Sequence, residues 1–242
     1  MIINKLRLFC SRFSRSVHYS FKPNFKIIAK IKPIYDISDL EKEIGVYSAS
    51  PDFIRKNCGA ITNSILDAIP SWYYHEAKEL GLYPNCDVRI HRLYPGDYPA
   101  YPGWHCDGEF RETYFSQPDL NKIPVSKHIF VCVSSHSDGV ANPEFLDRAW
   151  DFHSDEVNQS HTLWQQVNYD INNSPEKIPI FKTYDGDMVC FDNWSLHRVM
   201  PTINRGWRIF FRMSMWHKPN LGNSGMFSKQ ETVYLDLSRC GW

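Results

Sequence analysis

The chain has 242 residues, of which 43% are hydrophobic and 15% aromatic, enough to build the core of one ordinary domain. Its formal net charge is zero at pH 7, yet the first 35 residues hold eight Lys or Arg and no acidic residue, which leaves 19 basic and 27 acidic residues in the rest. An acidic body argues against a general nucleic-acid-binding protein, and no apolar run approaches the roughly 20 residues that span a membrane.

The basic N-terminal segment, residues 1–34, has two interpretations. Its apolar residues recur at helical spacing among Arg, Lys and Ser, a pattern typical of a mitochondrial presequence. The alternative is a basic arm packed loosely on the domain. Seven cysteines with no Cys-x-x-Cys pair predict no disulfide framework and favour a reducing, intracellular compartment, either the cytoplasm or the mitochondrion. The apolar residues at helical spacing are Ile2, Leu6, Phe9, Phe13 and Val17.

Residues 35–242 are expected to form a single domain, with its core in residues 85–217. Apolar residues at helical spacing predict one short helix near residues 37–44 and a second near residues 53–69, which Pro70 ends. Residues 146–172 are expected to be helical or irregular. The sequence beyond Asn85 favours strands at 87–94, 103–107, 128–134, 178–183, 187–192 and 207–216. This order predicts a mainly β fold with α additions, a double-stranded β-helix (jelly roll) with an N-terminal helical buttress.

Three residues are candidate metal ligands. His105 and Asp107 lie two apart in a predicted strand, so their side chains should point to the same side. His197 follows the apolar strand 187–192, and two histidines with one carboxylate bind one face of an octahedral Fe(II). His105, Asp107 and His197 are therefore the predicted metal site and the predicted catalytic centre.

Two further His-x-Asp pairs are alternatives, as is the absence of any metal. His153 and Asp155 lie in a polar, acidic run that is expected to be a solvated loop or helix start. His136 follows a predicted strand, but too little chain separates it from His197 to build a barrel between them. The first pair has the better context.

The last predicted strand places two arginines on one face. Alternation puts Arg208, Phe210, Arg212, Ser214 and Trp216 on that face and Ile209, Phe211, Met213 and Met215 on the other. Two inward arginines are costly unless anions meet them, so this face predicts an anion site. The alternative is that the polar face is simply solvated.

Several motifs, in this order, resemble the Fe(II)- and 2-oxoglutarate-dependent dioxygenase superfamily. The chain shows both prolyl-hydroxylase-like and taurine-dioxygenase-like features, and the resemblance covers about residues 85–217. The motifs are Tyr94-Pro-Gly-Asp97, Trp104-His-Cys-Asp107, the glycine-containing stretch 138–145, Gly186-Asp-Met-Val-Cys-Phe-Asp-Asn193, His197-Arg-Val-Met-Pro201 and Gly206-Trp-Arg208.

The resemblance implies Fe(II) as cofactor, with 2-oxoglutarate and O2 as cosubstrates. Arg208, eleven residues after His197, matches the arginine that binds the far carboxylate of 2-oxoglutarate, with Tyr94 and Ser214 beside the cosubstrate. Arg212 is then left for an acidic group of the substrate, unless the two arginines exchange roles. Arg92 and Trp104 are the remaining candidates for substrate contact, although Tyr94 and Trp104 also suit plain packing.

The expected function is hydroxylation or desaturation of an unactivated C–H bond of a small, carboxylated or amino-acid-like metabolite. An aspartate at position 107 leaves no room for halide and disfavours halogenation. Two alternatives stay open: an oxygenase that acts on a protein side chain, and a non-catalytic jelly roll that binds a metal or ligand.

Overall fold

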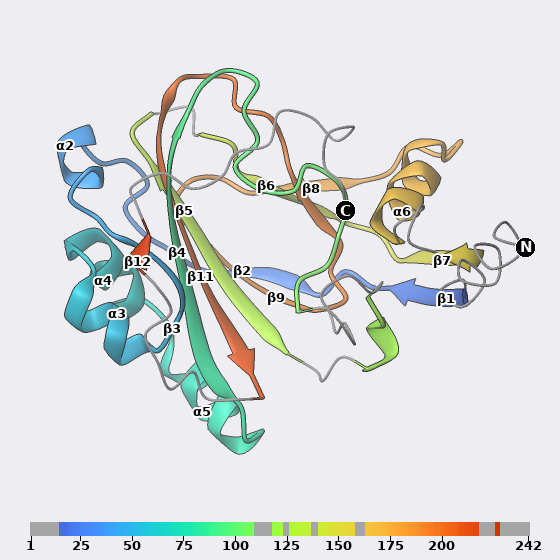
Figure 1. Cartoon of the computed structure of the whole chain (residues 1–242), viewed down its shortest axis with the longest axis horizontal. Helices are drawn as coiled ribbons and strands as arrows, with labels where there is room; N and C mark the ends of the chain where they lie inside the picture. The colour runs from blue at the N-terminus through green and yellow to red at the C-terminus, as the bar shows by residue number, and fades with distance from the viewer. Residues whose placement is uncertain are drawn as a thin grey trace, which may run out of the picture.

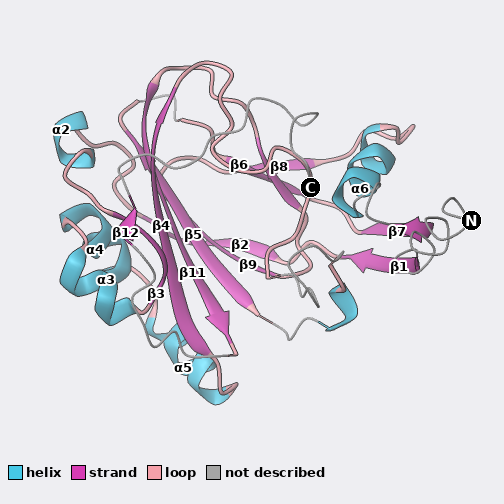
Figure 2. Cartoon of the chain, viewed as in Figure 1, coloured by secondary structure: helices cyan, strands magenta, loops and turns pink. Residues whose placement is uncertain are grey.

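The computed structural model describes residues 15–108, 118–122, 126–136, 140–157, 163–217 and 226–227. The fold is mainly antiparallel β-sheet with a few helices (Figure 2). Most of the presequence-like residues, Ile2 to Phe13, lie outside the described residues. No helix in the described part of the chain is both long and apolar enough to cross a membrane.

A seven-stranded antiparallel sheet forms the body of the molecule, in the order β12-β3-β4-β11-β5-β9-β2 (Figure 1). Its centre is the pairing of β4 with β11, which runs without a break from Gly206 opposite Leu93 to Trp216 opposite Tyr83. The strands are β2 (Phe25–Lys30), β3 (Gly45–Ala49), β4 (Tyr83–Leu93), β5 (Lys127–Ser134), β9 (Asp187–Asp192), β11 (Gly206–Trp216) and β12 (Met226–Phe227).

A smaller three-stranded sheet packs against one face of this main sheet. It contains β6 (Pro143–Leu146), β8 (Ile180–Lys182) and β10 (His197–Val199), in the order β10-β6-β8. Phe145 of β6 packs with Phe130 of β5 and Phe191 of β9 in one buried aromatic cluster, which holds the two sheets together.

Four short helices cover the other face of the main sheet (Figure 1). They are α2 (Ile37–Leu40), α3 (Pro51–Asn57), α4 (Ala60–Asp67) and α5 (Ser71–Glu79). Ser50 caps α3 by accepting a hydrogen bond from the backbone N–H of Phe53, and the Glu43 carboxylate accepts from Gly59 and Ile61 at the start of α4. Helices occur near both predicted ranges, but the single helix expected near residues 53–69 is two helices, because α3 ends at its C-cap Cys58 and α4 begins after its N-cap Gly59. The sequence patterns missed α5 and β3.

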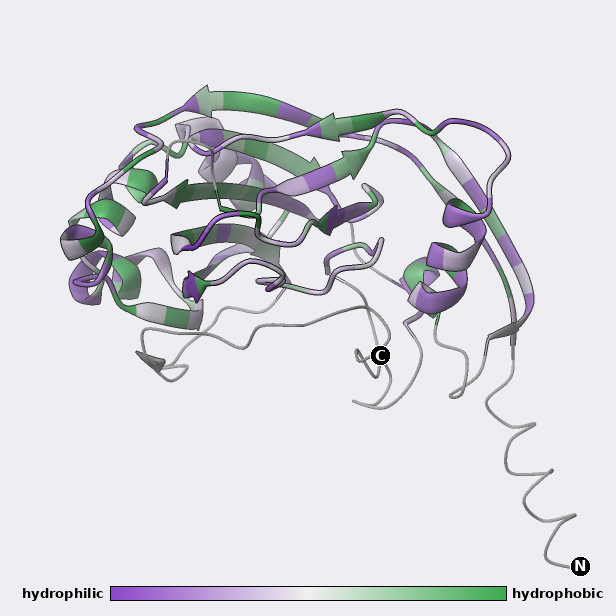
Figure 3. Cartoon of the chain, turned by 90° about the horizontal axis from the view of Figure 1, so that it is seen from above, coloured by the Kyte–Doolittle hydropathy of each residue, from purple (hydrophilic) through white to green (hydrophobic). Residues whose placement is uncertain are grey.

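A fourth layer lies at the opposite end of the molecule from these helices (Figures 1 and 3). It consists of β1 (Arg15–Phe21), its antiparallel partner β7 (Trp150–Val157), and α6 (Leu163–Asn172). Val17, Tyr19 and Phe21 are buried there. In Figure 3 the central strands are mostly hydrophobic, whereas the helices carry both kinds of residue.

This layer corrects two expectations. The helical pattern of the N-terminal segment does not extend to Val17, because residues 15–21 form a strand whose alternate side chains are buried. Residues 150–157, expected to be helical or irregular, form β7 because β1 supplies their strand partner. The helical face of Leu163, Trp164, Val167 and Ile171 is confirmed in α6, where all four are buried.

Strands are found at all the predicted positions except residues 103–107. That segment makes a single bridge, His105 with His197, and is otherwise irregular. The physical reason is Asn168 of α6, whose side-chain amide accepts from the backbone N–H of Trp104 (2.7 Å) and donates to its carbonyl (2.9 Å). A side chain thus takes the place of a neighbouring strand at Trp104.

Candidate active site

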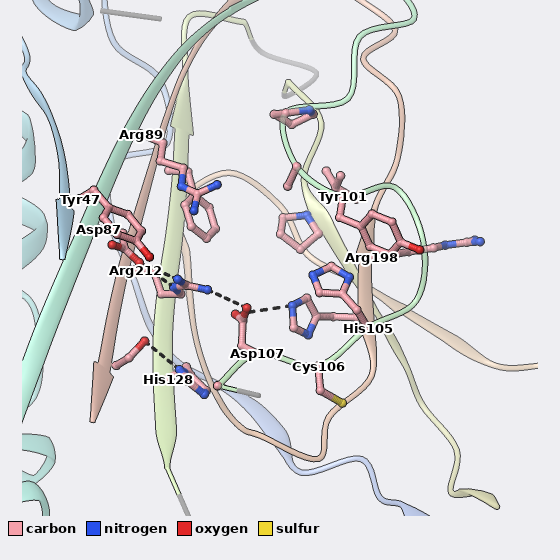
Figure 4. Close-up of a pocket in the computed structure, with 18 of the residues that line it drawn as sticks. Tyr47, Asp87, Arg89, Tyr101, His105, Cys106, Asp107, His128, Arg198 and Arg212 are labelled. Carbon is pink, nitrogen blue, oxygen red and sulfur yellow. Dashed lines mark hydrogen bonds and ion pairs between the residues drawn. The ribbon is translucent and has the colours of Figure 1, made fainter. Parts of the chain in front are cut away.

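A cavity of about 480 Å³ opens on the inner face of the main sheet (Figure 4). Alternate residues of β4 and β11 form one wall, since side chains two apart on a strand share a face. The opposite wall comes from the segment 99–108 and from the start of β10. Polar residues of the wall on β4 and β11 are Asn85, Asp87, Arg89, His91, Arg208, Arg212 and Ser214.

His105, Asp107 and His197 meet at this cavity. Their ligand atoms all lie within 4.8 Å of one another, and no other group of three metal-binding side chains occurs among the described residues. The backbones of His105 and His197 exchange two hydrogen bonds of 3.0 Å, which brings the two imidazoles together although 92 residues separate them. Asp107 Oδ2 lies 3.6 Å from His197 Nε2.

Both imidazoles are oriented by backbone carbonyls. Nδ1 of His105 lies 2.8 Å from the carbonyl of Gly103, and Nδ1 of His197 lies 3.0 Å from the carbonyl of Ser195. Because a carbonyl only accepts, each Nδ1 carries a proton, so in the neutral ring each Nε2 keeps its lone pair for a metal. Two neutral imidazoles and one carboxylate are a donor set that fits a divalent transition metal such as Fe(II).

Asp107 is held as a carboxylate. Burial alone would raise its pKa, but Arg212 and the three nearby histidines hold the pKa of Asp107 well below its usual range. The closest cation is Arg212, whose Nη1 lies 2.7 Å from Oδ1 of Asp107. One carboxylate oxygen therefore contacts Arg212, while the other faces His197.

Arg212 is also bound by Asp87 of β4 (Figure 4). Its Nη2 and Nε lie 2.5 and 3.2 Å from Oδ2 of Asp87, and Oδ1 of Asp87 accepts the backbone N–H of Ser48 (2.8 Å). Arg212 thus sits between two carboxylates, and its placement does not support the prediction that it is left for an acidic substrate. Asp87 had no local signal in the sequence, because its role depends on the pairing of β4 with β11.

Arg208, unlike Arg212, has no carboxylate bound to its guanidinium among the described residues. Only 2% of its surface is exposed, and its guanidinium lies over the ring of Phe210 and donates through Nη2 to the sulfur of Cys132 (3.2 Å). Its Nε and Nη1 are buried without a hydrogen-bond partner. A buried cation with unused donors at a cavity wall is arranged to receive an anion, since leaving it unpaired is costly.

Ser214 lines the cavity and is hydrogen-bonded to His128 of β5, which lines it too. Its hydroxyl lies 2.8 Å from Nδ1 of His128, and Ser126 Oγ lies 3.2 Å from the other ring nitrogen. Burial lowers the pKa of His128 to about 4, against a smaller opposing effect of Asp107, so the ring is neutral at pH 7. The sequence patterns did not identify His128 as part of the site.

Three other predicted contacts do not line the cavity. Tyr94 is half-exposed beyond the end of β4, where its ring stacks with the guanidiniums of Arg92 and Arg205. Arg92 lies on the opposite face of β4 from Arg89 and His91, because side chains alternate. Trp104 is buried in the core beneath α6, with Arg198 over its ring. Their placement does not support cosubstrate or substrate contact.

The alternative His-x-Asp pairs lie elsewhere. His153 and Asp155 pair with each other at 2.9 Å on the exposed side of β7, solvated as predicted but in a strand rather than a loop or helix. His136 follows β5 and does not line the cavity, and Asp138 lies outside the described residues.

No protein-family model and no curated protein matches the chain. Among solved structures, EvdMO1 is similar over 56% of this chain and only 27% of its own, with 12% identity and a TM-score of 0.30. AviO1 from Streptomyces viridochromogenes Tue57 is matched over 81% of this chain and 100% of its own, with 12% identity and a TM-score of 0.36. An N-substituted L-amino acid dioxygenase from Burkholderia ambifaria AMMD is matched over 90% and 89%, with 10% identity and a TM-score of 0.33.

Proposed function

We propose that the chain is an Fe(II)- and 2-oxoglutarate-dependent dioxygenase. One observation carries the proposal: the same cavity holds a converged His105, Asp107 and His197 set and a buried arginine, Arg208, with unused donors. The first arrangement suits Fe(II), and the second suits the far carboxylate of a dicarboxylic cosubstrate. The strand order supports a double-stranded β-helix, formed by the central strands of the main sheet and the smaller sheet that faces them.

In this proposal the chain positions its partners and the metal supplies the oxidative chemistry. Bound Fe(II) would let 2-oxoglutarate and O2 react together to oxidise a C–H bond of the substrate, with succinate and carbon dioxide as co-products. His105, Asp107 and His197 hold the metal. Arg208 binds the carboxylate through a charge-assisted pair, and Arg212 fixes the orientation of Asp107.

The cavity favours a small substrate. Its volume, about 480 Å³, lies in the range of small-molecule sites. With Arg212 bound by two carboxylates, the role of recognising an acidic substrate group moves to Arg89, which projects into the cavity from β4 (Figure 4). Hydroxylation or desaturation of a carboxylated or amino-acid-like metabolite remains the proposed reaction class.

The metal site is tested by spectroscopy without turnover. Purified anaerobically with Fe(II) and 2-oxoglutarate, the protein should develop a visible charge-transfer band, and His197→Ala or Asp107→Ala should abolish it. His153→Ala is the matched control, because it removes a histidine of the same sequence pattern that lies on exposed β7. If the band survives both changes at the cavity or is lost in the control, the proposed ligand set is wrong.

The cosubstrate site is tested by Arg208→Ala. We expect it to weaken 2-oxoglutarate binding by at least about 100-fold, because a charge-assisted pair in a buried site contributes several kcal/mol. Titrating the band with 2-oxoglutarate measures this affinity. If Arg208→Ala binds 2-oxoglutarate as tightly as the natural chain and Arg89→Ala does not bind it, the far carboxylate is bound by Arg89 instead.

A further inference from the structure

His91 is the second residue of the cavity wall with unused polar atoms. It lies on β4 directly opposite Arg208 in the antiparallel pairing with β11, so the two side chains are neighbours on the same face. Only 1% of His91 is exposed, and neither of its ring nitrogens has a hydrogen-bond partner. The buried His128, by contrast, has a hydroxyl at each ring nitrogen.

An imidazole buried in this way is arranged to receive a ligand. A neutral ring offers one donor and one acceptor, and a charged ring offers two donors, so either form loses hydrogen bonds to water when the site is empty. Arg208, the residue opposite His91 in the strand pairing, has two unused donors. Adjacent unused donors on neighbouring strands suit a ligand with two acceptor oxygens, which is a carboxylate.

The charges around His91 disfavour the protonated, positively charged form of its ring when no ligand is bound. Arg208 faces it from β11, and Arg89 lies two residues away on the same face of β4. From β5, Cys132 accepts a hydrogen bond from Arg208. Asp185, before β9, interacts with Arg208 and is hydrogen-bonded to Ser134 and Asn142. Burial, then Arg208 and Arg89, hold the pKa of His91 well below its usual value, so the ring is neutral.

We propose that His91 completes the carboxylate site with Arg208 and takes up a proton when the carboxylate binds. The inference rests on the proposed function, because it identifies the carboxylate with the far end of 2-oxoglutarate. The proton comes from the buffer and bonds to a ring nitrogen, while the ligand stays anionic. The incoming negative charge then lies between Arg208 and the charged His91, and it offsets the burial and the repulsion from Arg208 and Arg89 that keep His91 neutral without the ligand.

Calorimetry measures this proton directly. Anaerobic Fe(II)-loaded protein is titrated with 2-oxoglutarate at pH 7 in two buffers of different ionisation enthalpy, and the difference in heat gives the protons taken up. We expect net uptake approaching one proton for the natural chain and none for His91→Gln or His91→Asn, which keep a polar side chain that does not ionise. Pyruvate, which has the keto-acid end but no far carboxylate, is the matched ligand and should bind without uptake.

The affinity should also depend on pH. Because the bound state holds one more proton than the free state, 2-oxoglutarate should bind more weakly as the pH rises from 6 to 8, by up to about tenfold per pH unit. In His91→Gln the affinity should be flat over this range, and urea unfolding of both variants checks that they fold.

The outcomes separate this inference from the function on which it rests. If the natural chain binds 2-oxoglutarate in an Arg208-dependent way but takes up no proton, or if His91→Gln retains the uptake, the role of His91 is wrong and the function stands. If the natural chain neither forms the charge-transfer band nor binds 2-oxoglutarate, the proposed function itself is wrong, and the role of His91 with it.

Discussion

At the scale of single residues, the chain of contacts from Asp87 through Arg212 to Asp107 is the strongest electrostatic feature of the site. All three side chains are mostly buried, at 9%, 19% and 17% exposure. Removing one partner of a buried ion pair leaves the other unpaired, which commonly costs about 3–5 kcal/mol. The arrangement therefore couples the stability of the fold to the position of a proposed metal ligand.

A double-mutant cycle of Arg212→Met and Asp87→Asn tests this coupling. We expect each single change to destabilise the metal-free chain by about 3 kcal/mol and the double change to cost clearly less than the sum, measured by urea unfolding. The exposed pair Arg55 and Asp67, 2.7 Å apart, is the control and should show much weaker coupling. If the losses of stability from Arg212→Met and Asp87→Asn simply add, the two side chains do not interact as proposed.

The same arginine should influence metal binding. Arg212→Ala frees the carboxylate oxygen that contacts it, so Asp107 is no longer held in one orientation, and metal affinity should fall by about 10–100-fold. Competition with a chelator measures that affinity with Zn(II) in place of Fe(II), independently of activity. Unchanged affinity in a folded Arg212→Ala variant would remove the positioning role.

Buried neutral histidines predict how stability depends on pH. The folded-state pKa of His128 is about 4 because of burial, below its ordinary value of 6.5, so between these values the unfolded chain binds a proton that the folded chain does not. The free energy of unfolding of the metal-free chain should therefore fall as the pH is lowered from about 6.5 to about 4. His128→Gln should reduce this fall, and parallel curves for the two proteins would contradict it.

At the scale of elements, α6 holds the segment that carries two of the three proposed ligands. Asn168 is buried and satisfies both backbone polar groups of Trp104, one residue before His105. Gly103 leaves room for this contact, because a Cβ there would lie 2.7 Å from the Asn168 amide nitrogen. An α-helix thus positions the histidine that a regular strand was predicted to carry.

Asn168→Ala should loosen that segment. It leaves a buried N–H and a buried carbonyl of Trp104 without partners, so we expect a loss of about 2–3 kcal/mol in the free energy of unfolding and weaker metal binding. Asn173→Ala at the end of the same helix removes an exposed amide that donates to the Tyr169 carbonyl, and it should change neither quantity by much. Equal effects of the two changes would mean that Asn168 has no special role.

At the scale of the whole molecule, residues 15–30 connect three of the four layers. Strand β1 buries Tyr19 and Phe21 in the core beneath α6, and β2 continues the main sheet beside β9. Phe25 of β2 packs against Phe145 and Phe181 of the smaller sheet, with ring centroids 4.7 and 4.9 Å away. This half of the basic N-terminal segment is therefore part of the fold rather than a loosely packed arm.

Truncation tests where the folded unit begins. Removing residues 1–30 should prevent cooperative folding, since two strands and their aromatic contacts are lost. Phe21→Ala should cost about 3–5 kcal/mol, as is usual for a fully buried phenylalanine, and Tyr169→Ala on exposed surface should cost little. A stable protein that begins at Ile31 would contradict the assignment of β1 and β2 to the core.

The sequence by itself determined what depends on local period. Alternation along residues 206–216 placed Arg208, Arg212 and Ser214 on one face, because successive side chains of a strand point to opposite faces. The strand context of one of the three His-x-Asp pairs, together with His197 after an apolar strand, also nominated the three side chains that converge at the cavity. Neither inference required knowledge of which strands pair.

Only the tertiary structure decided what depends on register between distant segments. Asp87 meets Arg212, and His91 meets Arg208, because β4 pairs with β11 in one register across more than 100 residues of sequence, and nothing in the local pattern of either strand specifies it. Val17 also depends on distant segments. Its helical spacing predicted a helix, but it lies in a strand, because β7 provides hydrogen-bond partners and α6 provides an apolar surface. Local periodicity decides which side chains share a face, and long-range pairing decides which charges face each other.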